Sequence, residues 1–203
     1  MTTEAGGFDA IVLAAGAGAR FGGGKLLAPW AGGVLLDGAL AAAFAAPVTR
    51  VILVTGADAQ VGGAAKAYAQ RTGQTARLVI VHAADHAEGM GASLRRGAAE
   101  LGPACEGVFV FLGDMPRIPH AILPVLADAV RKGAPAAAPV HQGQRGHPAL
   151  LGRALLPQLR ELSGDAGARG LLKGLGDRLA LVEASDDGVL FDVDQPGDLG
   201  APR

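Results

Sequence analysis

Short apolar runs alternate with alanine-rich stretches of helical periodicity over the first two thirds of the chain. The apolar runs are typical of buried strands, whereas residues such as Leu94, Ala98 and Leu101 fall on one face of a helix. Strands that alternate with helices indicate right-handed βαβ units. We therefore predict an α/β fold, a mostly parallel twisted sheet with helices on both faces (Rossmann-like). The pattern predicts strands at 9–14, 50–55, 77–82 and 108–112, and helices at 36–46, 58–71, 90–101 and 122–130.

The last third of the chain is less regular. Its pattern indicates a strand at 136–140, a turn within 141–151, helices at 155–162 and 166–175, and a strand at 178–184. A length of 203 residues suits one domain. We expect residues 1–203 to form a single domain, with residues 1–7 as a flexible tail.

Composition narrows the class of protein. Half of the residues are hydrophobic and 18% are charged, which is typical of an ordered globular chain. A formal net charge of −1 provides no overall field for a nucleic acid or an anionic membrane. Cys105 is the only cysteine, so an intrachain disulfide is excluded. With no signal peptide and no membrane-length apolar stretch, we expect a cytoplasmic protein.

A glycine-rich loop, "LAAGAGARFGGGKLL", follows the first predicted strand. It is not a P-loop, because Ala19 replaces the first glycine of that motif and Leu26 follows the lysine. It is a poor dinucleotide fingerprint, because Phe21 occupies the third glycine position. The loop nevertheless combines flexible backbone N–H donors with the planar fork of Arg20 and the mobile charge of Lys25. We favour a polyphosphate site over a plain turn with two solvated cations.

A candidate metal ligand follows the apolar run "VFVFL". Asp114 lies in "GDMP", and a carboxylate there can hold Mg²⁺ against phosphate oxygens. The alternative is a helix cap, which Pro116 makes awkward because it delays the next helix. Since ligands bind at the carboxyl ends of parallel strands, Asp114 and the glycine loop should share one edge of the sheet.

Asp192 and Asp194 are candidates for a second metal carboxylate. If this segment is extended, both side chains point to one side. The alternative is a solvated strand end followed by a turn at Gln195 and Pro196.

Two further groups of residues can be explained without a binding role. Gly89, Met90 and Ser93 lie at a loop-to-helix junction that suits a base or ribose, or ordinary capping. Asp165 and Arg169 are four residues apart, so Asp165 could cap a helix and pair with Arg169.

The histidines carry less information. His147 lies in a Gly-His-Pro turn, where a lone histidine is usually a surface residue. His82, Asp85 and His86 lack a third strong ligand, so we do not expect zinc there.

Several motifs together resemble one family over nearly the whole chain. The glycine loop is followed in matching order and spacing by "EGMGASLRRG", "GDMP", "RGHPALL", "GDAGAR" and "DVDQPGDL". This series resembles the nucleotidyltransferases with a GT-A-like Rossmann fold, and within them the molybdenum cofactor cytidylyltransferases. Two departures stand out: Gly18 replaces a frequent serine, and "GVLLDG" replaces the usual Gly-x-Pro-Leu after the loop.

The resemblance implies a Mg²⁺-dependent transfer of CMP from CTP to the terminal phosphate of molybdopterin, with release of pyrophosphate. It implies that Asp114 and Asp194 hold Mg²⁺, with Asp194 preferred over Asp192. His147, Asp165 and Arg169 would face the acceptor. Catalysis would depend on Arg20, Lys25 and Asp114. The nucleotide would be held by Ala14, Ala15, Gly16, Gly18, Arg20, Lys25, Gly89, Met90 and Ser93.

Several alternatives stay open at this point. The base could be guanine, although related guanylyltransferases carry a second glycine where this chain has Ala15. The acceptor could be another phosphorylated molecule. The protein could also be a non-catalytic carrier of molybdenum cofactor, although a carrier needs no site for a metal and a triphosphate. A molybdenum enzyme that receives the product is a possible partner.

Overall fold

The computed structural model describes residues 7–165 and 167–200. Residues 1–6 of the expected tail lie outside the described residues. Gly7 is described, and its carbonyl oxygen accepts a hydrogen bond from the Glu106 amide at 3.0 Å.

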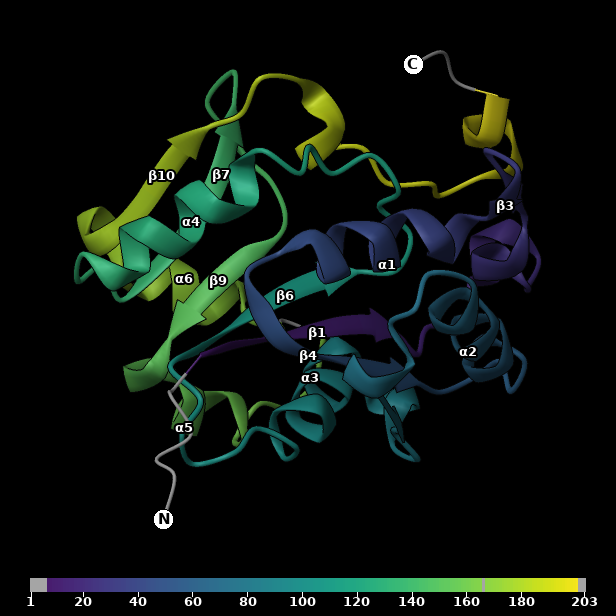
Figure 1. Ribbon diagram of the computed structural model, residues 1–203, viewed down its shortest axis with the longest axis horizontal. Coiled ribbons are helices and arrows are strands. Elements are labelled where there is room, and N and C mark those ends of the chain that lie inside the picture. Colours follow the sequence, from purple (N-terminus) through teal and green to yellow (C-terminus); the bar gives the residue numbers. More distant parts are fainter. Residues whose placement is uncertain (1–6, 166, 201–203) are drawn as a thin grey trace.

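The molecule is built on a twisted sheet with the strand order β10-β7-β9-β6-β1-β4-β5 (Figure 1). Its parallel half consists of β1 (Phe8–Ala14), β4 (Val48–Thr55), β5 (Leu78–His82) and β6 (Gly107–Leu112). This half confirms the predicted βαβ units. The apolar runs of β1, β4 and β6 are largely buried, as expected of strands covered on both faces, whereas β5 at the edge is only half-buried over most of its length.

The other half of the sheet is mixed. β7 (Ala136–His141) and β10 (Leu179–Glu183) pair in parallel, whereas β9 (Ala149–Gly152) runs antiparallel to both β6 and β7. The short β8 (Gln144–Arg145) pairs with β7. A separate hairpin of β2 (Pro29–Trp30) and β3 (Gly33–Val34) follows the glycine loop.

Helices cover both faces of the sheet and create two cores. One core holds Ala10 and Val12 of β1 together with residues of α1 (Leu35–Ala45), α2 (Val61–Arg71) and α4 (Ile122–Arg131). The other holds Ile11 together with residues of α3 (Met90–Ala98), α5 (Leu156–Leu159) and α6 (Arg169–Gly174). Successive residues of β1 thus face opposite cores, as strand geometry requires. No helix in the described part of the chain is long and apolar enough to cross a membrane.

The predicted boundaries needed correction in places. The turn predicted within 141–151 is confirmed at Gln142 and Gly143, but the same region also contains β8 and the start of β9, whose four residues are all buried. Helix α2 begins at Val61 rather than at residue 58, because the Asp58 carboxylate accepts a hydrogen bond from the Gln60 amide and forms a turn there. The helix expected at 155–162 is only the four-residue α5.

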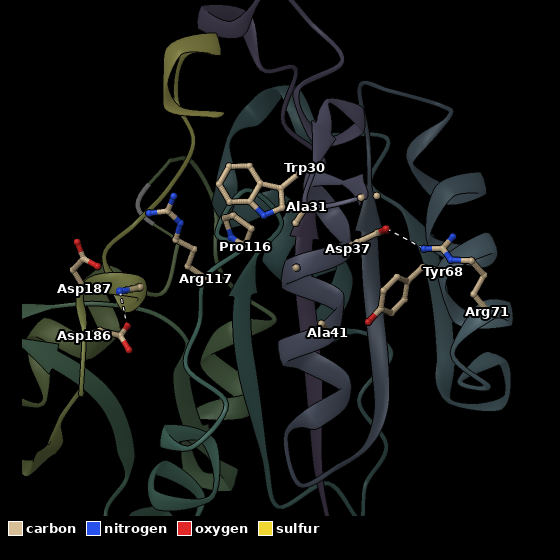
Figure 2. Close-up of a pocket in the computed structure, with 14 residues that line it drawn as sticks. Trp30, Ala31, Asp37, Ala41, Tyr68, Arg71, Pro116, Arg117, Asp186 and Asp187 are labelled. Carbon is tan, nitrogen blue, oxygen red and sulfur yellow. Dashed lines mark hydrogen bonds and ion pairs between the residues drawn. The ribbon is translucent and has the colours of Figure 1, made fainter. Parts of the chain in front are cut away.

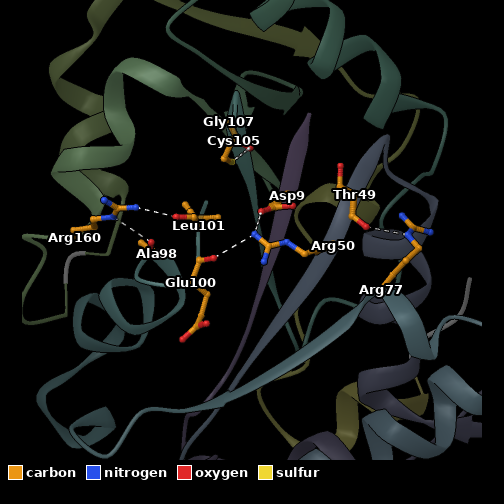
Figure 3. A network of polar contacts seen from close by, with 10 residues as sticks. All are labelled: Asp9, Thr49, Arg50, Arg77, Ala98, Glu100, Leu101, Cys105, Gly107 and Arg160. Atoms are coloured by element: carbon orange, nitrogen blue, oxygen red, sulfur yellow. Dashed lines mark hydrogen bonds and ion pairs between the residues drawn. The ribbon is translucent and has the colours of Figure 1, made fainter. Parts of the chain in front are cut away.

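A polar network ties together the end of the sheet at which β1 begins (Figure 3). The buried Asp9 accepts a hydrogen bond from Arg50 at 2.6 Å, and Arg50 also donates to the Glu100 carbonyl at 3.2 Å. Arg160 donates to the Leu101 carbonyl at 3.0 Å. Cys105 lies nearby, and burial raises the pKa of its thiol. This end of the sheet lies opposite the glycine loop, which follows the other end of β1.

Candidate active site

The glycine loop leaves the end of β1 and folds back on itself. Gly22, Gly23 and Gly24 have φ values of 88°, 93° and 64°, which favour glycine over any other residue. Gly18 has φ 59°, and a Cβ atom there would lie 3.0 Å from the Cβ of Lys25. Glycine at position 18 therefore allows the loop to approach Lys25 closely.

Both cations of the loop are paired with carboxylates from distant parts of the chain. The Lys25 ammonium lies 2.7 Å from Asp114 and 3.6 Å from Asp194. Arg20 donates to the other carboxylate oxygen of Asp194 at 3.0 Å. The Lys25 side chain is only 12% exposed, whereas that of Arg20 is 80% exposed. Lys25 is thus not a solvated cation, whereas Arg20 is largely exposed to solvent.

Three carboxylates converge beside Lys25. The segment 191–194 lies outside the sheet, but the Val193 amide donates to the Asp114 carbonyl at 3.1 Å. Val193 is buried, and the flanking Asp192 and Asp194 are both more exposed. Partial withdrawal from water raises the pKa of Asp192, and the negative charges of Asp114 and Asp194 raise it further.

This arrangement suits a divalent cation that is completed by substrate. Among residues 7–165 and 167–200, no group of three or more His, Cys, Asp or Glu side chains is already arranged to hold a metal ion. Mg²⁺ usually takes one or two protein carboxylates and completes its shell with phosphate oxygens and water. The repulsion of Asp192 by the carboxylates of Asp114 and Asp194 would be reduced by a cation bound near them. The chemistry of Asp114 with Asp194 or Asp192 is thus compatible with a divalent cation that substrate would complete.

A small hollow of about 100 Å³ lies beside the loop. Ala14, Gly16 and Gly18 line it together with Lys25 and Asp114. Asp58, to which the sequence analysis assigned no role, also lines it. Backbone of the loop, a cation and a carboxylate therefore meet in one place, as the polyphosphate prediction requires.

The beginning of α3 is packed tightly against a second loop. The helix begins at Met90, as predicted, after Gly89 with φ 119°. Ser93 is buried. The Gly91 amide donates to the Gly164 carbonyl at 2.7 Å, and a Cβ at Gly91 would lie 2.7 Å from that same oxygen. This contact was not predicted, although glycine at 91 permits it.

A larger cavity of about 290 Å³ opens between these two segments and the sheet. His147, Asp165 and Arg169 line it, as does Met90, so these expected site residues lie around one space. Arg145 adds a second guanidinium that the sequence analysis left without a role. Its apolar wall comes from β1, β6, β9, α3 and α6, through Leu13, Val110, Leu112, Ala149, Leu94 and Leu172. Leu13 also lines the smaller hollow, so both spaces border this residue of β1.

His147 is not the surface residue that a turn usually carries. Burial lowers the pKa of its imidazole, and the positive charges of Arg145 and Arg169 lower it further. Its Nδ1 atom is buried without a hydrogen-bond partner. Burial therefore favours the neutral form of the ring.

The plain reading of Asp165 as a helix cap is wrong. Helix α6 begins at Arg169, its N-cap is Ala168, and no side chain caps it. Within the described part of the chain, no ion pair joins Asp165 to Arg169. Both charged groups line the cavity instead.

The group formed by His82, Asp85 and His86 is held by other contacts. Asp85 accepts a hydrogen bond from Arg95 at 2.5 Å, which lowers the pKa of its carboxyl. The two imidazole rings lie edge to face with centroids 6.5 Å apart. This carboxylate is therefore engaged by an arginine.

Known proteins are similar in sequence to almost the whole chain. Residues 10–182 match the family described as the MobA-like NTP transferase domain. The chain is 30% identical over 190 residues to the molybdenum cofactor cytidylyltransferase of Escherichia coli strain K12, covering 94% of this chain and 92% of that protein. It is 31% identical over 192 residues to the nicotine blue oxidoreductase of Paenarthrobacter nicotinovorans, covering 91% and 90%.

Solved structures share the fold. Rv0371c from Mycobacterium tuberculosis H37Rv superposes with a TM-score of 0.78 at 26% identity, covering 96% of each chain. A structure of Rv0371c in complex with manganese gives a TM-score of 0.68 over 88% of each chain.

Proposed function

Because the chain belongs to the MobA-like NTP transferase domain family, an enzyme family of nucleotidyltransferases, we propose that it transfers CMP from CTP to the terminal phosphate of molybdopterin. Pyrophosphate is the second product, and the acceptor already carries molybdenum. The observation that carries this proposal is the pairing of Lys25 with Asp114 at the glycine loop, beside a second cavity that contains two arginines.

The glycine loop holds the triphosphate. Backbone N–H groups of the loop approach the phosphate oxygens closely because glycines leave room for them. Lys25 and Arg20 exchange their carboxylate partners for phosphate oxygens when the nucleotide enters. This chemistry requires positioning and charge neutralisation more than a covalent nucleophile.

Asp114 and Asp194 hold Mg²⁺ in this proposal. A bound Mg²⁺ supplies neutralisation of the α-phosphate and of the leaving pyrophosphate. The three converging carboxylates support this assignment, and Rv0371c has been seen with manganese.

The larger cavity takes the acceptor. Its apolar wall suits a flat ring system, and Arg145 and Arg169 offer charge to an anionic group. His147 is neutral there, so its imidazole contributes a hydrogen bond rather than a charge. Both spaces border Leu13, and the proposal requires that an acceptor phosphate in the larger cavity meets the nucleotide at the loop.

Cytosine is favoured over guanine by Ala15. This assignment rests on the resemblance, in which related guanylyltransferases carry a second glycine at this position. The Ala15 methyl itself is packed in the core, so any effect on the base would act through the adjoining backbone. The cytidylyltransferase of E. coli, similar over 94% of this chain, points the same way.

A reduction like that of the nicotine blue oxidoreductase has equal support from overall similarity. The glycine loop argues against it, because Phe21 occupies the third glycine position of a dinucleotide fingerprint. A non-catalytic carrier of molybdenum cofactor would not need the carboxylates beside Lys25. A molybdenum enzyme is the proposed recipient of the product.

The proposal is tested by incubating the protein with Mg²⁺, molybdenum cofactor and equal concentrations of CTP, GTP and ATP in competition. Mass spectrometry of the dinucleotide identifies the base. We expect the cytosine dinucleotide to predominate. Equal or greater formation of the guanine dinucleotide would contradict the base assignment, and reduction of a pigment with NADH or NADPH would favour the oxidoreductase.

A further inference from the structure

The segment that carries Asp192 and Asp194 has no sheet partner. Residues 191–194 belong to no helix or strand. Asp198 holds the far end of this segment, because its carboxylate accepts hydrogen bonds from the amides of Asp194 at 2.8 Å and Gln195 at 2.7 Å. Beside the carboxylates the segment is held by the Val193 amide, which donates to the Asp114 carbonyl at 3.1 Å, and by the ion pairs of Asp194 with Arg20 and Lys25. A further contact lies at its near end.

A cluster of one arginine and two aromatic rings lies at that near end. The Arg117 guanidinium carbon lies 3.8 Å from the ring centroid of Phe191 and 5.4 Å from that of Trp30. The two rings also contact each other, with centroids 6.1 Å apart. Figure 2 shows Arg117 beside Trp30 at one wall of a groove of about 730 Å³, with Asp186 and Asp187 beyond it.

The cluster joins three parts of the chain that meet at the carboxylates. Arg117 follows Asp114 by three residues, Phe191 precedes Asp192, and Trp30 belongs to the hairpin after the glycine loop. The backbone at Arg117 is packed closely as well, since a Cβ at Gly188 would lie 2.2 Å from the Arg117 carbonyl oxygen.

We propose that Arg117 is a positioning residue for the candidate metal site. Its guanidinium stacks on Phe191 and so holds Asp192 and Asp194 beside Asp114, although it need not touch substrate itself. The planar guanidinium suits this contact better than an ammonium, because it stacks on a ring face with both charge and surface. The inference rests on the metal site of the proposed function.

The test measures Mn²⁺ affinity by electron paramagnetic resonance in the presence of CTP, without turnover. For Arg117→Ala we expect about tenfold weaker binding, the effect of losing a cation–ring contact together with the order that it imposes. Arg117→Lys keeps the charge but not the plane, and should lie in between. Phe191→Leu removes the other partner of the contact and should weaken Mn²⁺ binding to a similar extent. It replaces Arg117→Ala in the test if that variant does not fold.

Arg131→Ala is the matched control. Arg131 lies 5.0 Å from the ring centroid of Phe8, in a comparable contact that involves no candidate site residue. This variant should bind Mn²⁺ within twofold of the wild type.

A second readout does not depend on metal. Hydrogen exchange at the Val193 amide, which bonds the Asp114 carbonyl, should be at least about tenfold faster in Arg117→Ala than in wild type and in Arg131→Ala. Unchanged Val193 protection, or unchanged Mn²⁺ affinity in a folded Arg117→Ala protein, would overturn the inference. If the wild type binds no Mn²⁺, the metal assignment of the proposed function fails, and the exchange rate of Val193 still decides whether Arg117 positions the segment.

Discussion

Lys25 shows how one side chain can pair with carboxylates and also be available to a phosphate. Its ammonium lies between Asp114 and Asp194, and it is largely shielded from water. In this state it offsets two negative charges that would otherwise repel each other. We propose that an arriving triphosphate takes over this lysine while a metal ion takes over the carboxylates.

Asp114→Asn tests the metal role at this scale. The substitution keeps the shape and one acceptor oxygen but removes the charge that binds a hard cation. We expect a folded protein whose kcat falls by at least about a hundredfold, with a smaller change in KM for CTP. A titration of turnover against Mg²⁺, with circular dichroism as the check on folding, measures this. A near-normal rate at ordinary Mg²⁺ would remove Asp114 from the site.

Arg20→Ala and Lys25→Ala separate an exposed from a shielded cation. Both variants should raise KM for CTP at least tenfold, because each removes a charge from the triphosphate. The Tm of Arg20→Ala should stay within about 1 °C of wild type, since its side chain is 80% exposed. Lys25→Ala should melt a few degrees lower, because Asp114 and Asp194 lose their shared cation. Normal kinetics in both folded variants would show that the loop does not bind triphosphate.

At the scale of elements, periodicity predicted the parallel half of the sheet and the helices on both of its faces. It failed at β9, because a strand of four residues after a turn is too short to show a period. It also misplaced the start of α2, where the local hydrogen bond from Gln60 to Asp58 overrides helical propensity.

The candidate site was predictable to a similar degree. The rule that ligands bind at the carboxyl ends of parallel strands placed the glycine loop and Asp114 together. The resemblance drew attention to His147 and Arg169, which line one cavity. Arg145 and Arg117 escaped notice because their roles depend on contacts between segments far apart in the sequence, which no local spacing reveals.

The contact between α3 and the loop before α6 can be tested with paired glycine substitutions. Gly91→Ala should lower the free energy of unfolding by about 1–3 kcal/mol, because the new methyl group meets the Gly164 carbonyl. Gly63→Ala is the control, since that glycine of α2 has open space around it and alanine should stabilise the helix by up to about 1 kcal/mol. Urea denaturation compares the two. Equal stability of both variants would contradict a tight contact at Gly91.

At the scale of the whole molecule, the two ends of the sheet carry different kinds of residues. The end at which β1 begins is closed by Asp9, Arg50 and the carbonyl of Glu100, whereas the other end carries the loops of the candidate site (Figures 1 and 3). Stability and catalysis should therefore respond to different substitutions.

Asp9→Asn tests this division. The variant removes the charge of the buried Asp9 and leaves the half-buried Arg50 without its carboxylate partner. The free energy of unfolding should therefore fall by about 2 kcal/mol. Asp128→Asn, which breaks an exposed ion pair with Arg131, should cost no more than about 0.5 kcal/mol. Neither should change kcat/KM per folded molecule, and a large kinetic loss in Asp9→Asn would show that the two ends are coupled.

The central claim is that the protein transfers a nucleotidyl group, and tracing the phosphorus atoms of CTP tests it most directly. The protein is incubated with Mg²⁺ and molybdenum cofactor, and with CTP labelled at either the α- or the γ-phosphorus. We predict that the α-label enters the dinucleotide product and that the γ-label leaves in pyrophosphate, one for each dinucleotide formed. An active, folded preparation that releases the γ-label as inorganic phosphate, or that forms no α-labelled dinucleotide with CTP or any other nucleoside triphosphate, would contradict the account.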